Sequence, residues 1–167
     1  MGMATELLVA FGIMGVCLVI HVTGIVVLGD TIVRRGERIK HRITFVYAAA
    51  LLTLLFLALI ILHVIEAAIW AGFFLGGGLF PNFESALYFS LTTYSTAGYG
   101  DVLLPPQWRL LGTIEAISGV LLCGLSVAFL FAVVNALFQS QGLRLRRAQI
   151  QKDEEAITER AGTQQPG

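Results

Sequence analysis

Three apolar segments constrain this chain more than any other feature of its sequence. They run from Leu7 to Leu28, from Ile43 to about Ala71 and from Leu110 to Phe138. Each reaches the roughly 20 residues that a helix needs to cross a hydrocarbon core of about 30 Å. Of all residues, 56% are hydrophobic and only 13% are charged, which is far from the composition of soluble domains. We therefore predict an all-α, multi-pass protein of the cell membrane with three transmembrane helices in the lipid bilayer.

Two basic clusters predict how these helices are oriented. Arg34 to Arg42 follows the first apolar segment, and Arg144 to Lys152 follows the third. Lys and Arg are enriched in cytoplasmic flanks, and two spans separate the clusters, so we expect both in the cytoplasm. The N-terminus would then lie outside and the C-terminus in the cytoplasm. The first residues carry no basic region, so we do not expect a cleavable signal peptide.

The segment from Gly72 to Pro106 should begin and end on the outer side. Its "GGGLFPN" run breaks a helix, and Asn82 is expected to cap a new one from Phe83 to Tyr94. That helix is only about 18 Å long, so it penetrates about half of the bilayer and the chain must return. Non-helical backbone at that depth is tolerated only inside protein or beside water. We expect "STAGYGD" to be such a segment, with carbonyl groups free to bind something other than backbone N–H.

The residues Thr96-Ala97-Gly98-Tyr99-Gly100-Asp101 resemble the selectivity-filter signature of the potassium-channel pore-loop family, whose usual form has Val or Ile in place of Ala97. The resemblance covers Phe83 to Phe138 as pore helix, filter and inner helix, with Ile43 to Ala71 as the outer helix. It leaves Leu7 to Leu28 as an additional helix. It implies a homotetramer with a re-entrant pore helix in each subunit, because the filter is built from four such loops.

The resemblance also implies roles for individual residues. K⁺ would be held by the carbonyl oxygens of four residues, which are Thr96, Ala97, Gly98 and Tyr99. The Thr96 side chain would add further ligands and the Tyr99 ring would brace the filter. Gly98 and Gly100 would supply backbone angles that other residues avoid, and Asp101 would support the filter. Losing two methyl groups at Ala97 is expected to soften the filter and to weaken discrimination against Na⁺.

Several ionisable residues fall inside the apolar segments. Glu66 and His63 are three apart on one helix face. Three roles remain open for Glu66: a hydrogen bond near the back of the filter or a place at the headgroups beside Trp70, proton sensing, or metal binding with His63. Glu115 is also expected to support the filter, because an intramembrane carboxyl usually finds a polar partner and marks a functional site. His21 is expected to form a hydrogen bond between helices.

The third apolar segment carries a further pattern. Side chains three or four positions apart share one helix face, which predicts a stripe of Val120, Cys123, Val127, Phe131 and Asn135. By resemblance to inner helices, this stripe faces the cavity below the filter, and Phe131 either gates the pore or packs between subunits. Gly119 and Gly124 resemble the glycines at which such helices bend, although glycine also permits close packing.

We predict three regions: residues 1–42 as an additional helix and basic loop, 43–140 as the pore domain, and 141–167 as a cytoplasmic tail that frays from Asp153 onward. The predicted function is passive K⁺ conduction; the alternatives are a weakly selective cation channel and a non-conducting regulatory subunit. Charges balance at 11 of each sign, so overall charge says nothing about a nucleic-acid or acidic partner, and we expect no nucleic-acid partner. No catalytic constellation is present, so we expect neither enzyme activity, an organic cofactor nor a substrate other than ions.

Overall fold

The protein is all-α in a computed structural model that describes residues 2–38 and 45–163. Its elements in chain order are α1 (Met3–Arg38), α2 (Phe45–Gly76), α3 (Phe83–Tyr94), the short 3₁₀ helix η1 (Pro106–Trp108) and α4 (Arg109–Thr163). No strand occurs among the described residues, and the predicted fold class is confirmed.

Three of the helices are long and apolar enough to cross a membrane, as predicted. The spans are Met3–Arg34, Val46–Gly76 and Pro106–Gln139. Each has more residues than a hydrocarbon core of about 30 Å requires of an upright helix, so each tilts or projects beyond the core. The chain is therefore a multi-pass membrane protein.

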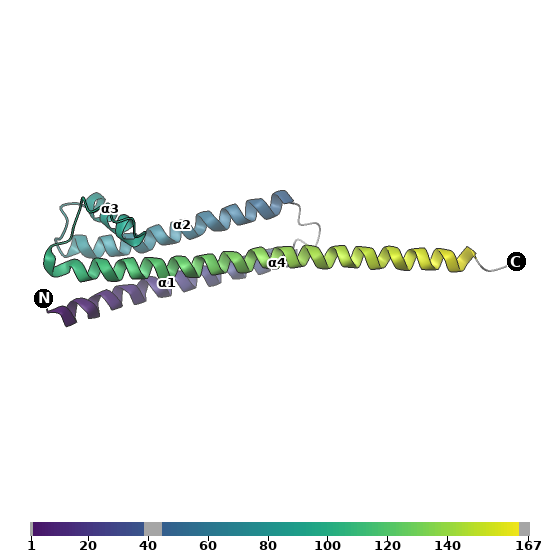
Figure 1. Cartoon of the computed structure of the whole chain (residues 1–167), viewed down its shortest axis with the longest axis horizontal. Helices are drawn as coiled ribbons and strands as arrows, with labels where there is room; N and C mark the ends of the chain where they lie inside the picture. Colours follow the sequence, from purple (N-terminus) through teal and green to yellow (C-terminus); the bar gives the residue numbers. More distant parts are fainter. Residues whose placement is uncertain (1, 39–44, 164–167) are drawn as a thin grey trace.

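The three spans run side by side, and α3 lies at one end of the group (Figure 1). This is also the end at which α1 begins and at which α2 meets the following loop (Figure 1). α3 packs on α2 and α4, and α1 packs on α2 and α4. α2 and α4 are thus the helices on which the other elements pack.

The second half of α4 extends past the other helices as a single continuous helix (Figure 1). The prediction that the chain frays from Asp153 was wrong, because α4 continues to Thr163. This part of α4 contains many Glu, Ala, Gln and Arg residues, which are good helix formers. The described residues do not include 164–167 of the predicted tail, 39–42 of the predicted basic loop, or 43–44 at the start of the predicted outer helix.

α2 ends at the glycine run, as predicted. Gly78 has a φ of +67°, which is costly for other residues and ordinary for glycine. The N–H of Leu79 donates to the carbonyl of Phe74 at 3.0 Å, and the N–H of Gly78 donates to that of Leu75 at 2.9 Å. This is the Schellman pattern that satisfies the last carbonyls of a helix. It turns the chain sharply toward α3.

α3 begins and ends at the predicted residues. The Asn82 side chain accepts a hydrogen bond from the Ser85 N–H at 2.9 Å and caps the helix. Three aromatic rings fix α3 on α2, since Phe89 lies 5.5 Å from Phe74 and 5.2 Å from Phe80 between ring centroids. Burying each such ring contributes about 1.5–3 kcal/mol. This cluster sets the position of everything that follows Tyr94.

Candidate functional site

The segment after α3 has an unusual backbone. φ is positive at every second residue, with values of 60° at Thr96, 46° at Gly98 and 77° at Gly100. Positive φ at a β-branched residue is an outlier that costs of order 1–3 kcal/mol. A segment in which positive φ recurs at every second residue turns its successive carbonyl groups toward the same side. The two predicted glycines and Thr96 together therefore give this segment its form.

The N–H groups of this segment are partly bonded to the end of α3. The Thr96 N–H donates to the Thr93 carbonyl at 2.9 Å, and the Gly98 N–H donates to the Thr92 carbonyl at 3.0 Å. Within the described part of the chain, no hydrogen bond reaches the carbonyls of residues 96–99. These residues are also exposed. Their oxygens are available to a ligand, as the sequence predicted for a segment of free carbonyls.

Asp101 is tied to α3 at the far end of the segment. Its Oδ2 accepts a hydrogen bond from the Tyr88 hydroxyl at 2.7 Å, and its Oδ1 accepts one from the Val102 N–H at 3.0 Å. The bond to the carboxylate raises the pKa of the Tyr88 phenol above its usual value. Asp101 thus holds the end of the segment against α3, which is compatible with its predicted supporting role.

Glu66 lies behind the start of the segment, in a buried polar cluster. Its side chain is fully buried. One carboxylate oxygen accepts a hydrogen bond from the Tyr94 hydroxyl at 2.5 Å, and the other lies 2.8 Å from His21 Nδ1. The prediction that His21 bonds between helices is confirmed. Glu66 bonds to Tyr94, directly before this segment, and its role in supporting a filter stays a prediction. Glu66 and Trp70 are both buried against the other helices, and a place at the headgroup level also stays a prediction.

Two further residues close this cluster into a ring. His63 Nδ1 lies 3.2 Å from Glu66 Oε2 and 3.2 Å from the Tyr94 hydroxyl. Ser126 Oγ lies 3.1 Å from Nε2 of His63 and 3.1 Å from Nε2 of His21. We call His21, His63, Glu66, Tyr94 and Ser126 the buried ring; they come from α1, α2, α3 and α4. No sequence pattern pointed to Tyr94 or Ser126, because single hydroxyls are common in membrane helices.

Glu115 is also fully buried, but its surroundings differ. Neither of its oxygens has a hydrogen-bond partner among the described residues, and the same holds for the hydroxyls of Ser90 and Ser118. Ser90 is its neighbour without reaching hydrogen-bond geometry. The polar partner expected for Glu115 is therefore not found among the described residues, and its predicted supporting role stays a prediction.

A cavity of about 390 Å³ joins the carbonyl segment to α4. It is lined by His63, Tyr94, Ser95, Thr96, Gly119, Val120 and Cys123. The structure thus brings Thr96 together with the first two residues of the predicted stripe. The other three, Val127, Phe131 and Asn135, are exposed farther along α4. Glu115, Ser118, Leu122 and Ser126 are buried on the opposite face.

Gly119 marks the closest approach between α3 and α4. A Cβ at this position would overlap the Tyr94 carbonyl oxygen, whereas a Cβ at Gly124 would meet nothing within 4 Å. The packing interpretation of Gly119 is therefore confirmed. Bending at either glycine stays a prediction.

Comparison with known proteins defines the class. Residues 49–136 match the protein family described as "Ion channel", which is more than half of the 167 residues. A multi-pass membrane protein with this match is an ion channel. The chain belongs to the two-span, pore-type family of ion channels, and its α1 lies outside the matched region. No curated protein and no solved structure gives a match to this chain.

Proposed function

We propose that this chain forms a homotetramer that conducts K⁺ passively through a filter made of four copies of residues 96–101. The observation that carries the proposal is the alternating backbone at Thr96, Gly98 and Gly100, next to carbonyl oxygens that accept no hydrogen bond in the described chain. Rings of such carbonyls replace the hydration shell of K⁺ in filters of this type. α3 then acts as the pore helix, and Thr96, Ala97, Gly98 and Tyr99 hold the ions.

A single chain cannot surround an ion with these oxygens. Tyr99 is 73% exposed, and a second hollow of about 430 Å³ opens beside it, between Thr96, Gly98 and the start of α4. Both features lie at the segment that carries the free carbonyl groups, where the proposed filter needs contact between subunits. Four subunits around one axis would bury it and bring the carbonyls to face one another.

The charge distribution supports an orientation with the filter near the outer face. α3 lies at the end where α1 begins (Figure 1). The basic residues that begin at Arg34 lie at the other end of α1, and Arg144 to Lys152 lie in the extension of α4. Since basic flanks favour the cytoplasm, the N-terminus is outside and the C-terminus inside.

We considered two alternatives to a K⁺-selective channel, and features of the segment 96–101 favour one and disfavour the other. A weakly selective cation channel is favoured by Ala97, whose small side chain leaves less packing behind the carbonyls than Val or Ile would. A non-conducting regulatory subunit is disfavoured, because the costly positive φ at Thr96 would serve no purpose in a loop that binds nothing.

The test substitutes one glycine inside the proposed filter and one outside it. Gly98→Ala places a side chain at a φ of +46°, where an L residue loses roughly 1–2 kcal/mol. Gly72→Ala is the matched control, because a Cβ there meets nothing within 4 Å and needs no positive φ. We expect K⁺ flux into vesicles from the parent and from Gly72→Ala, and little from Gly98→Ala.

The K⁺ flux of each variant is compared with its oligomeric state in detergent. All three proteins should elute from detergent at the size of a tetramer. Equal flux in Gly98→Ala and in the parent would contradict the proposed filter, and an intact parent that elutes as a monomer would contradict the tetramer.

A further inference from the structure

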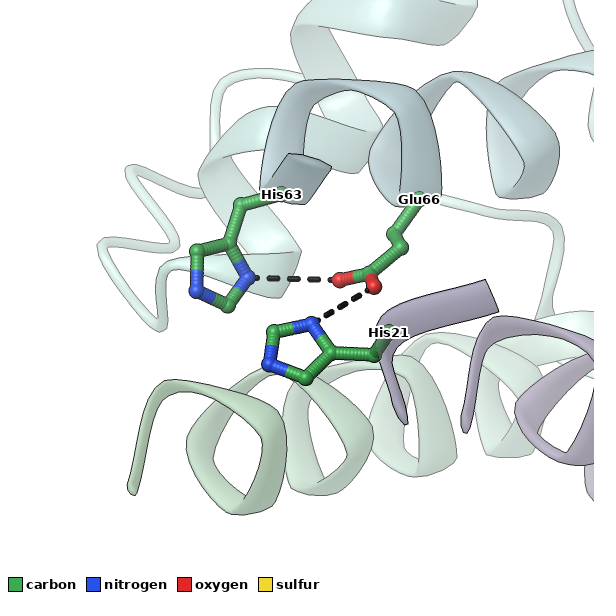
Figure 2. A group of neighbouring side chains, drawn as sticks. All are labelled: His21, His63 and Glu66. Carbon is green, nitrogen blue, oxygen red and sulfur yellow. Dashed lines mark hydrogen bonds and ion pairs between the residues drawn. The ribbon is translucent and has the colours of Figure 1, made fainter. Parts of the chain in front are cut away.

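The buried ring contains three side chains of the type that bind transition metals. One ring nitrogen of His21, one of His63 and one Glu66 oxygen all lie within 4.8 Å of one another. Figure 2 shows both imidazoles turned toward the carboxylate, one from α1 and one from α2. We propose that His21, His63 and Glu66 form a binding site for a divalent transition metal such as Zn²⁺, which fastens α1 to α2.

The donor atoms fit this chemistry. Imidazole nitrogen suits Zn²⁺, Ni²⁺, Cu²⁺ and Fe²⁺, whereas Mg²⁺ and Ca²⁺ prefer oxygen. Ligand atoms around a tetrahedral Zn²⁺ are about 3.4 Å apart, given metal bonds of about 2.0–2.2 Å. The Glu66 oxygens already lie 2.8 Å from His21 Nδ1 and 3.2 Å from His63 Nδ1. Small rotations of the two rings would complete the set.

Ser126 gives a second, independent reason. Its Oγ lies 3.1 Å from Nε2 of both imidazoles. If one metal ion is bound by both Nδ1 atoms, both Nε2 atoms carry hydrogen. The single Ser126 hydroxyl oxygen can then accept a hydrogen bond from each of them. Such an outer partner on the second ring nitrogen is the usual way in which a ligating histidine is oriented.

The same side chains can also be held by hydrogen bonds without a metal. If each Nδ1 donates to Glu66, both Nε2 atoms become acceptors, and the Ser126 hydroxyl has only one hydrogen to give. A metal-free cluster then needs either a second proton on one imidazole or the other tautomer of His63, whose Nε2 would donate to Ser126 while its Nδ1, 3.2 Å from the Tyr94 hydroxyl, accepts. Co²⁺ binding distinguishes the metal site from these metal-free states.

A metal can reach the site and would complete its coordination there. His63 lines the cavity that also contains Thr96 and Cys123, so its side chain is partly open while His21 and Glu66 are fully buried. Three protein ligands leave a fourth position for water. The metal would join the helix outside the family match to the carboxylate that holds Tyr94, next to the segment 95–101.

The test measures metal binding by the purified chain of 167 residues, carrying a tag without histidine. Co²⁺ serves as the spectroscopic probe and Zn²⁺ as the competitor. We expect one Co²⁺ per subunit, with intense visible bands that Zn²⁺ abolishes. His21→Gln and Glu66→Gln should each weaken binding at least about tenfold, as loss of metal-site residues commonly does.

Two controls assign the ligands. His41→Gln removes the third histidine of the chain, which lies outside the described residues, and Cys123→Ser removes the thiol beside the cavity; both should bind Co²⁺ like the parent. Binding that is lost in either control and kept in His21→Gln would overturn the proposal. So would a parent protein that binds no Co²⁺.

A second measurement covers variants that fail to fold. Crystals of the unaltered protein soaked in Zn²⁺ should show anomalous density between His21, His63 and Glu66. Density elsewhere, or none, would overturn the site.

Discussion

At the end of α3 the backbone of Tyr94 lies directly against Gly119 of α4. The single hydrogen of glycine is what permits this approach, and the approach sets the distance between the carbonyl segment and α4. Gly124, five residues on, has open space around it. The two glycines therefore offer a matched pair for separating close packing from helix propensity.

Gly119→Ala should destabilise the assembled protein. The new methyl group must displace the end of α3, and overpacking of this kind costs about 1–3 kcal/mol. For a chain of this size that corresponds to a loss of roughly 2–12 °C in Tm. Gly124→Ala should be neutral or slightly stabilising, because alanine favours helix by about 1 kcal/mol over glycine. Thermal unfolding in detergent measures both, and equal Tm values for the two variants would contradict the packing.

Ala97→Val tests the selectivity proposed for the carbonyl segment. The two added methyl groups refill space behind the carbonyls and contribute about 1.5 kcal/mol of packing. If that energy holds the filter at K⁺ spacing, the K⁺/Na⁺ permeability ratio should rise by up to about tenfold. Bi-ionic reversal potentials of parent and variant give the ratio. An unchanged or lower ratio would mean that Ala97 does not loosen the filter.

At the scale of elements, α4 has two distinct faces. One buries Glu115, Ser118, Leu122 and Ser126 against α1, α2 and α3. The other exposes the stripe that begins at Val120 and Cys123 beside Thr96. Exposure on one subunit is what a surface lining a shared cavity requires, and it is equally what a subunit interface requires.

Thiol modification and one truncation separate these two uses of the stripe. Cys123 should react with a charged thiol reagent applied from the cytoplasmic side, and the current should fall. Phe131 is 67% exposed, and four such rings on the axis could close the path by dewetting; Phe131→Ala should then hold the pore open. An inert Cys123 in open channels would place the stripe on another face. Unchanged open probability in Phe131→Ala would place the gate elsewhere.

Element bounds were predicted correctly where nearby residues specify them, such as a capping residue or a glycine run. α3 begins at Phe83 because Asn82 caps it and a glycine run ends α2 before it. The prediction for the end of α4 was wrong, because polar composition alone does not predict fraying. The residues there favour a helix. That the residues of the stripe share one face of α4 followed from spacing alone, whereas the opposite, buried face was not predicted.

The buried ring could be predicted only in part. His63 and Glu66 share one helix, so their proximity follows from a spacing of three. His21 is separated from Glu66 by 45 residues, and only the packing of α1 on α2 brings them together. The bond between Tyr94 and Glu66 could not be predicted from the sequence, because it depends on how α3 packs against α2.

At the scale of the whole molecule, three spans and one half-length helix form a unit with an exposed carbonyl segment at one end (Figure 1). The family match covers α3 and most of α2 and of the apolar half of α4. α1 packs outside this region and is tied to it through His21. The molecule thus consists of the region that matches the ion-channel family and one additional helix, α1. Through His21, α1 is bonded to the Glu66 carboxylate behind the proposed filter.

The most direct test is the reversal potential of the purified chain in a pure-lipid bilayer with K⁺ on one side and Na⁺ on the other. A homotetrameric potassium channel predicts a current whose reversal potential lies close to the K⁺ equilibrium value. A current that reverses near zero would contradict K⁺ selectivity and favour a weakly selective cation channel. The absence of any current from correctly assembled protein would contradict conduction itself and favour a regulatory subunit.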